Sequence, residues 1–201
     1  KSYHHGNLRE ALIEAALGLI AERGVIGVSF AEAARRAGVS PAAPYRHFRD
    51  REDLLIETAR IGFERFAVSL EAAWNQGRPT PLSAFEALGR AYLAFAREES
   101  AFFSAMFDPG LRATHGKELA TAGARAFDAL HGACAALAMQ LPAGKRPPTH
   151  MMAYHVWAMS HGIATLFGQA ETGHAPIDAE EMLEAGTTIY LQGLGLIPSQ
   201  D

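Results

Sequence analysis

Apolar residues recur at intervals of three and four along almost the whole chain, and no segment shows the strict alternation of a half-buried strand. Glycines, prolines and capping residues end these apolar runs. The pattern predicts helices over residues 7–24, 29–37, 40–48, 50–77, 81–97, 100–107, 114–140, 148–168 and 178–194. The sequence therefore predicts an all-α protein.

The composition is that of a globular protein, with 49% hydrophobic and 20% charged residues among 201. A single cysteine, Cys134, excludes an internal disulfide and favours a reducing, cytoplasmic location. No apolar run reaches the ~18 residues that a membrane span requires, and the first residues lack the pattern of a signal peptide. We therefore expect no membrane partner.

The charge is distributed unevenly, although the net charge is −4. Residues 1–55 carry eight basic and seven acidic side chains, whereas the remaining residues carry ten basic and fifteen acidic ones. The N-terminal quarter is therefore the less acidic part, and nucleic acid would have to bind there. This balance permits DNA binding without requiring it.

Residues 29–48 have the pattern of a helix-turn-helix. Ser29 is a predicted helix cap, and small residues in the following helix let a second helix pack closely. Gly38 suits the tight reversal because it adopts a positive φ angle readily, and Ser40 is placed to cap the second helix. A helical hairpin used only for packing would share these features, so the turn alone leaves that alternative open.

The residues after the turn resemble the TetR family of regulators. The resemblance lies in Tyr45-Arg46-His47-Phe48 and in the acidic and basic start of the next helix, Asp50-Arg51-Glu52-Asp53-Leu54-Leu55, and it covers about residues 7–60. It implies a three-helix DNA-binding domain in residues 1–55. A long fourth helix would join that domain to a C-terminal helical bundle domain in residues 56–201, which binds a ligand and dimerises.

Two positions depart from the family pattern. Ala42 stands where the family usually has glycine, and Pro44 stands where it usually has an aliphatic residue. Proline lacks a backbone N–H, so Pro44 is predicted to remove one hydrogen bond and to bend the recognition helix slightly.

The resemblance also implies which residues contact DNA. Tyr45 and His47 would contact phosphates, and Arg46 would read a guanine through O6 and N7. The full set of expected DNA-contacting residues is Ser29, Ser40, Ala42, Ala43, Tyr45, Arg46, His47 and Arg51. Because Ala42 and Ala43 are small, direct base contacts should be few, and dimer spacing and DNA shape should supply much of the specificity.

Trp157-Ala-Met-Ser-His161-Gly162 resembles the Trp-x-x-x-His-Gly signature of a TetR C-terminal class named WHG. That class implies a homodimer on a palindromic operator, released by a small apolar or amphipathic effector. The expected ligand-binding residues are Phe95, Phe102, Phe103, Met106, Phe107, Met151, Tyr154, His155 and Phe167. The expected dimer residues are Trp157, His161, Gly162, Thr165, Met182, Ile189 and Tyr190.

Three rival interpretations remain: a metal-sensing repressor, a helical-bundle enzyme and a purely structural bundle. Glu171 and His174 have the spacing of a di-iron ligand pair, but glycines and a proline surround them and the motif occurs once. The sequence therefore predicts no catalytic residue, metal site or cofactor.

Overall fold

In the computed structural model, which describes residues 8–167 and 178–198, every regular element is a helix. The α-helices are α1 (Leu8–Arg23), α2 (Phe30–Arg36), α3 (Arg51–Trp74), α4 (Pro81–Glu98), α5 (Ser100–Met106), α6 (Pro109–Ala138), α7 (Thr149–Phe167) and α8 (Ala179–Gly193). Short 3-10 helices are η1 (Val25–Gly27), η2 (Pro44–Arg46), η3 (Asn75–Gly77) and η4 (Ala143–Lys145). The predicted all-α fold is confirmed.

The chain forms two compact units, and α3 and α6 each contribute to both. The N-terminal unit consists of Lys1–Glu64 and Glu99–Gly123, and the C-terminal unit of Arg65–Glu98 and Ala124–Asp201. The segment 99–123, which contains α5, thus packs with the N-terminal residues although it lies far along the chain. The division of function between residues 1–55 and 56–201 stays a prediction.

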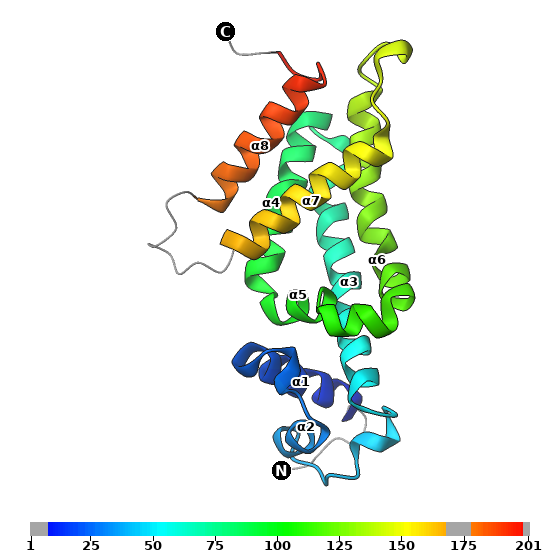
Figure 1. The fold of residues 1–201 in the computed structure, drawn as a ribbon, viewed down its shortest axis with the longest axis vertical. Helices are drawn as coiled ribbons and strands as arrows, with labels where there is room; N and C mark the ends of the chain where they lie inside the picture. The colour runs from blue at the N-terminus through cyan, green and yellow to red at the C-terminus, as the bar shows by residue number, and fades with distance from the viewer. Residues whose placement is uncertain (1–7, 168–177, 199–201) are drawn as a thin grey trace. The chain divides into compact units, whose positions relative to one another are not determined.

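In the N-terminal unit, α1 packs against α2 and α5 (Figure 1). Leu12, Leu19 and Ala16 of α1 are fully buried, as their helical spacing predicts. Gly62 brings α3 close to α5, because a Cβ atom at this position would lie 2.8 Å from Sδ of Met106.

In the C-terminal unit, α7 packs against both α4 and α8, and α8 also contacts α4 (Figure 1). The core of this unit includes the fully buried side chains of Phe66, Tyr92 and Met152. Gly186 of α8 lets the Met159 side chain of α7 approach closely, since a Cβ atom at Gly186 would lie 2.6 Å from the Met159 sulfur. These three helices carry the surfaces considered below.

Three predicted helix starts are confirmed by their caps. The Ser29 hydroxyl accepts the Glu32 N–H at 3.3 Å, the Asp50 carboxylate accepts the Asp53 N–H at 2.8 Å, and Asp178 caps α8. The helix predicted from about residue 114 corresponds to the part of α6 that follows a kink at His115 (φ −126°), and a further helical stretch precedes the kink. Asp108 accepts the Leu111 N–H at 2.9 Å and Pro109 occupies the first helical position, so α6 begins at Pro109.

Asn7, a predicted cap of the first helix, and the pair Glu171 and His174 lie outside the described residues. Across residues 8–167 and 178–198, no helix combines the length and the apolar character needed to cross a bilayer.

Candidate nucleic-acid interface

The predicted turn after α2 is confirmed in detail. Gly38 has a φ of 70°, its N–H donates to the Arg35 carbonyl at 3.2 Å, and the Val39 N–H donates to the Ala34 carbonyl at 3.0 Å. This pair of bonds is the Schellman motif, which satisfies the last carbonyls of a helix. The geometry depends on glycine, because a side chain is strained at this positive φ.

The segment after the turn differs from the prediction. Sequence analysis predicts an α-helix that Ser40 caps, but residues 41–47 form turns and the 3-10 helix η2. Pro44 explains the difference: without an N–H it cannot donate to the Ser40 carbonyl, which accepts the Ala43 N–H at 3.0 Å instead. The Arg46 N–H then donates to Ala43 at 3.2 Å, which continues the tighter pattern.

The segment nevertheless presents most of the expected DNA-contacting side chains to solvent. Ser29, Ser40, Ala42, Tyr45, Arg46 and His47 are exposed, and Ala43 is half-buried. The Tyr45 ring is 64% exposed and packs edge-on against Phe30, with ring centroids 5.0 Å apart. Pro44 and Phe48 are buried and hold the segment against the unit.

The arginines of the N-terminal unit differ in whether their side chains form ion pairs or hydrogen bonds. Arg35 forms two hydrogen bonds with Glu32, and Arg36 pairs with Glu22. Among residues 8–58, Arg46 is the arginine whose side chain has no hydrogen bond or ion pair in the structure. Its guanidinium is therefore available to an external acceptor.

Arg51 has a different environment. Its Nε donates to the Val28 carbonyl and its Nη2 to the Val25 carbonyl, both at 2.7 Å. These bonds tie the start of α3 to the connection between α1 and α2. The guanidinium is thus engaged inside the unit, although sequence analysis places it on a phosphate.

The start of α3 is held by reciprocal contacts. The Arg49 N–H donates to the Asp53 carboxylate at 2.9 Å, and this bond, with a smaller contribution from the Arg49 side chain, lowers the pKa of Asp53. Asp53 in turn donates its N–H to Asp50. Both ends of the 3-10 segment are therefore anchored, by the Gly38 turn and by this cap.

The residues predicted to bind a ligand divide between the two units. Phe102, Phe103, Met106 and Phe107 belong to the N-terminal unit, and Phe95, Met151, Tyr154, His155 and Phe167 belong to the C-terminal unit. Phe102, Phe103 and Met106 are buried in their unit, whereas Met151, Tyr154 and His155 are exposed on α7. Their role in ligand binding stays a prediction.

The residues predicted to form the dimer also fall into two groups. Trp157 packs edge-on against Tyr92 at 5.6 Å, and the His161 Nδ1 lies 3.1 Å from the Tyr92 hydroxyl, so both residues bind α7 to α4. Ile189 is 70% exposed and Thr165 is exposed, while Gly162, Met182 and Tyr190 are half-buried.

No local pattern in the sequence indicates the role of Tyr92, since its contact with His161 spans 69 positions. Burial raises the pKa of the Tyr92 hydroxyl well above its usual range. Tyr92 is therefore a neutral, hydrogen-bonded group at the centre of the C-terminal unit.

A Schellman-type turn, an exposed Tyr-Arg-His surface and a separate helical unit define a helix-turn-helix regulator. The family described as "Bacterial regulatory proteins, tetR family" matches residues 12–58, and the family described as "Tetracyclin repressor-like, C-terminal domain" matches residues 85–190. The chain belongs to the TetR family, whose members are DNA-binding transcriptional regulators and not enzymes. The family resemblance found in the sequence is confirmed, and the second match includes Trp157, His161 and Gly162.

Solved structures share the fold over nearly the full chain. A protein of unknown function from Rhodococcus sp. RHA1 is 30% identical, with a TM-score of 0.73 over 96% of this chain and 98% of its own. The fatty acid degradation regulator FadR from Bacillus halodurans is 14% identical, with a TM-score of 0.75 over 94% and 97%. At that identity the second likeness concerns the fold alone.

Curated relatives match over shorter segments. The HTH-type transcriptional regulator BetI from Rhizobium meliloti is 48% identical over 52 residues, 26% of each chain. BetI from Brucella canis is 34% identical over 93 residues, 45% of this chain and 46% of its own. The chain thus matches between about a quarter and about half of the length of these relatives.

Proposed function

We propose that the protein binds a palindromic operator as a homodimer, that it represses transcription there, and that a small apolar or amphipathic effector releases it. The observation that carries the DNA-binding proposal is the exposed Arg46, whose guanidinium pairs with no described residue and which lies between Tyr45 and His47. A guanidinium in this state pairs bidentately with a guanine edge or with a phosphate.

The 3-10 geometry limits what the surface can read. Ala42 and Ala43 offer only methyl groups, so contact with a thymine methyl or with the shape of the groove is all that they supply. Tyr45 and His47 carry polar groups suited to phosphate contact, which fixes orientation without reading sequence. We therefore propose one direct reader for each half-site, with the spacing of the dimer providing the remaining selectivity.

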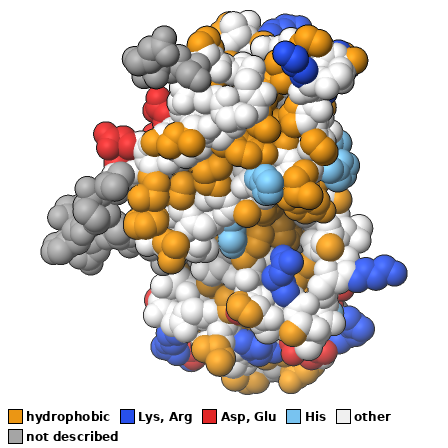
Figure 2. Space-filling view, turned by 45° about the horizontal axis from the view of Figure 1, so that its top comes forward, with side chains coloured by type: hydrophobic (Ala, Val, Ile, Leu, Met, Phe, Trp, Pro, Cys, Tyr) orange, Lys and Arg blue, Asp and Glu red, His pale blue; other side chains and the backbone are white. Residues whose placement is uncertain are grey.

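The dimer is proposed to form through the outer faces of α7 and α8. Leu166 is 76% exposed and Ile189 is 70% exposed. Met151 and Tyr154 add exposed apolar surface on α7, and Figure 2 shows hydrophobic side chains and histidines together on one face of the molecule. Side chains of this kind are unfavourable in water and favourable in a twofold interface.

The test of DNA binding uses a duplex fragment of the promoter beside the protein's own gene, with binding measured by gel shift and fluorescence anisotropy over a range of salt. Arg46→Ala and Tyr45→Ala should each weaken binding strongly. Arg60→Ala is the matched control, since Arg60 pairs with Glu57 in the middle of α3. No binding by the parent protein from low to moderate salt would contradict the proposal.

The effector is proposed to act by a population shift. It would favour a dimer whose two recognition segments no longer match successive major grooves. The measurement compares melting temperature and operator affinity over a panel of apolar and amphipathic compounds. If compounds that raise the melting temperature leave operator affinity unchanged, this mechanism is wrong.

A further inference from the structure

A pocket lies between α4, α7 and α8 in the C-terminal unit, and none of the residues predicted to bind a ligand lines it. It contains about 530 Å³ of space, counting its opening to solvent. Apolar side chains buried in the unit form much of its wall: Phe85, Leu88, Leu93, Val156 and Leu183. Such a wall suits a small apolar group.

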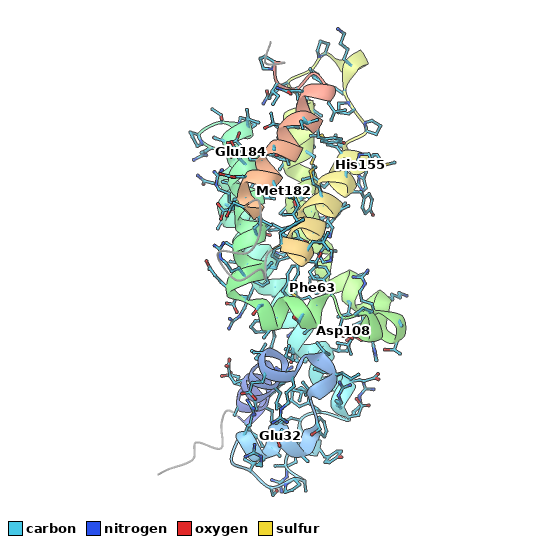
Figure 3. The ribbon with its side chains drawn as sticks, turned by 60° about the vertical axis from the view of Figure 1, so that its left-hand side comes forward. Glu32, Phe63, Asp108, His155, Met182 and Glu184 are labelled. Carbon is cyan, nitrogen blue, oxygen red and sulfur yellow. The ribbon has the colours of Figure 1, made fainter. Side chains whose placement is uncertain are left out.

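The charged side chains around this pocket are mostly acidic. Glu86, Glu180 and Glu184 line it, against the single cation Arg90. Glu86, Glu184 and Arg90 have no ion pair with a described residue, whereas Glu180 lies 3.7 Å from Arg97. Figure 3 labels Glu184 on α8. The lining therefore carries a net charge of about −2 at neutral pH, which favours a cation.

Ser160 gives a second, independent indication of a ligand. The side chain lines the pocket and is only 2% exposed, yet no described residue forms a hydrogen bond with its hydroxyl. Helical hydroxyls elsewhere in the unit donate to a carbonyl one turn earlier, as Thr187 does to Leu183 at 2.7 Å. No fully enclosed side-chain oxygen or nitrogen among the described residues lacks a partner, so the Ser160 oxygen is open to the pocket, where a polar atom of a ligand can pair with it.

The pocket and the proposed dimer surface occupy opposite faces of α8. Glu180, Leu183, Glu184 and Thr187 face the pocket, whereas Ala185 and Ile189 are exposed on the other side. The positions facing the pocket are spaced by three and four residues, which defines one stripe of a helix. Glu184 stands at the border between the two faces, since it also lines a shallow hollow with Ala185 and Ile189.

We infer that this pocket binds a small organic cation, an amine with an apolar body, whose ammonium group pairs with Glu184 and Glu180 while its hydrocarbon lies against Leu88 and Leu183. Ser160 offers the ligand one further hydrogen bond. The inference rests on the proposed function only in assigning the amine the role of effector, because binding itself requires no DNA.

The experiment compares three compounds with the same six-carbon chain: hexylammonium, 1-hexanol and hexanoate. Binding to the full-length protein is followed by chemical-shift titration of the isotope-labelled chain without DNA. Hexylammonium should bind about fivefold or more tightly than 1-hexanol, and hexanoate should bind weakest. Equal binding of hexanoate, or no shift at residues lining the pocket, overturns the inference.

Two variants test the named side chains. Glu184→Gln should abolish the preference for hexylammonium over 1-hexanol, while Glu181→Gln, which removes the same charge from an exposed position outside the pocket, should keep it. An unchanged preference in Glu184→Gln contradicts the assignment. Ser160→Ala should melt no lower than the parent protein, because it loses no bond within the described chain. A melting temperature lower by several degrees would show that the hydroxyl already has a partner.

Operator affinity is measured separately. If hexylammonium binds but operator affinity does not change, the pocket assignment stands and the amine is not an effector. If the protein binds no operator at all, the proposed function fails while the pocket result remains.

Discussion

The Nε of Arg51 donates to the Val28 carbonyl oxygen at 2.7 Å, which joins the first turn of α3 to the connection in front of α2. The same guanidinium reaches the Val25 carbonyl. Arg51, which the family resemblance places on a phosphate, therefore supports the surface that is proposed to face DNA from within the unit.

Replacement of Arg51 should reduce stability more than it changes DNA recognition. Arg51→Met removes two charge-assisted hydrogen bonds and leaves two carbonyls without this donor, so we expect a loss of about 2 to 3 kcal/mol in the free energy of unfolding. Urea denaturation measures this loss. In folded protein the salt dependence of operator binding should stay as in the parent, since no phosphate contact is lost. If Arg51→Met shows a shallower salt dependence of operator binding and unchanged stability, Arg51 contacts a phosphate after all.

Pro44 determines the conformation of the segment that is proposed to face DNA. Pro44→Ala supplies an N–H that can donate to the Ser40 carbonyl. Alanine is also more favourable than proline in the interior of an α-helix, by about 3 kcal/mol. Residues 41–47 should then shift toward α-helical carbon chemical shifts, and the preferred operator sequence should change in a selection from random duplexes. Pro41→Ala is the control, because Pro41 is exposed and lies at the start of the segment. Unchanged chemical shifts in Pro44→Ala would contradict this account.

The sequence predicts local features of the fold well and distant contacts poorly. The Gly38 turn and the cap at Ser29 follow from residue types whose preferences act within a few positions. The sequence predicts that Pro44 bends the recognition helix slightly, whereas the structure has a 3-10 helix there. Loss of one donor in a helix this short leaves too few hydrogen bonds to hold the α-helical form.

Side-chain partners across long separations explain what the sequence leaves out. Arg51 is an exposed basic residue in the sequence pattern, and only the fold brings Val25 and Val28 to it. The pocket beside Ser160 is equally hidden, since its wall comes from three helices that no periodicity connects. Residues implied by the family resemblance therefore identify surfaces better than they identify individual roles.

Cys134 should make the protein less stable at alkaline pH. Burial raises the pKa of its thiol from 9.0 to about 12, so the unfolded chain loses this proton first as the pH rises. The contribution to stability is complete below pH 9 and decreases toward pH 12, by up to about 1.4 kcal/mol per pH unit.

The measurement is the free energy of unfolding between pH 8 and about 10.5, in the parent protein and in Cys134→Ala. The parent should lose about 2 kcal/mol more than the variant over this range. Tyr92, whose pKa is raised by burial alone, contributes equally to both proteins, whereas Cys134 also raises the pKa of Tyr190, so the difference between the curves reports the thiol together with this coupling. Parallel curves would contradict the assigned burial of Cys134.

The proposed dimer interface consists of the outer faces of α7 and α8. Leu166→Glu and Ile189→Glu place a charge where the proposed twofold interface excludes water, so each should weaken dimerisation by at least about 2 kcal/mol, or roughly thirtyfold. Both side chains are largely exposed in the single chain, and the substitutions should therefore leave the helical signal in circular dichroism unchanged.

Val68→Glu on α3 is the matched control, since Val68 is also an exposed apolar residue, at 53%. Sedimentation velocity over a range of concentrations measures the effect. A dimer that persists in both variants would place the interface elsewhere, whereas dissociation with loss of operator binding would connect the two recognition segments to this surface.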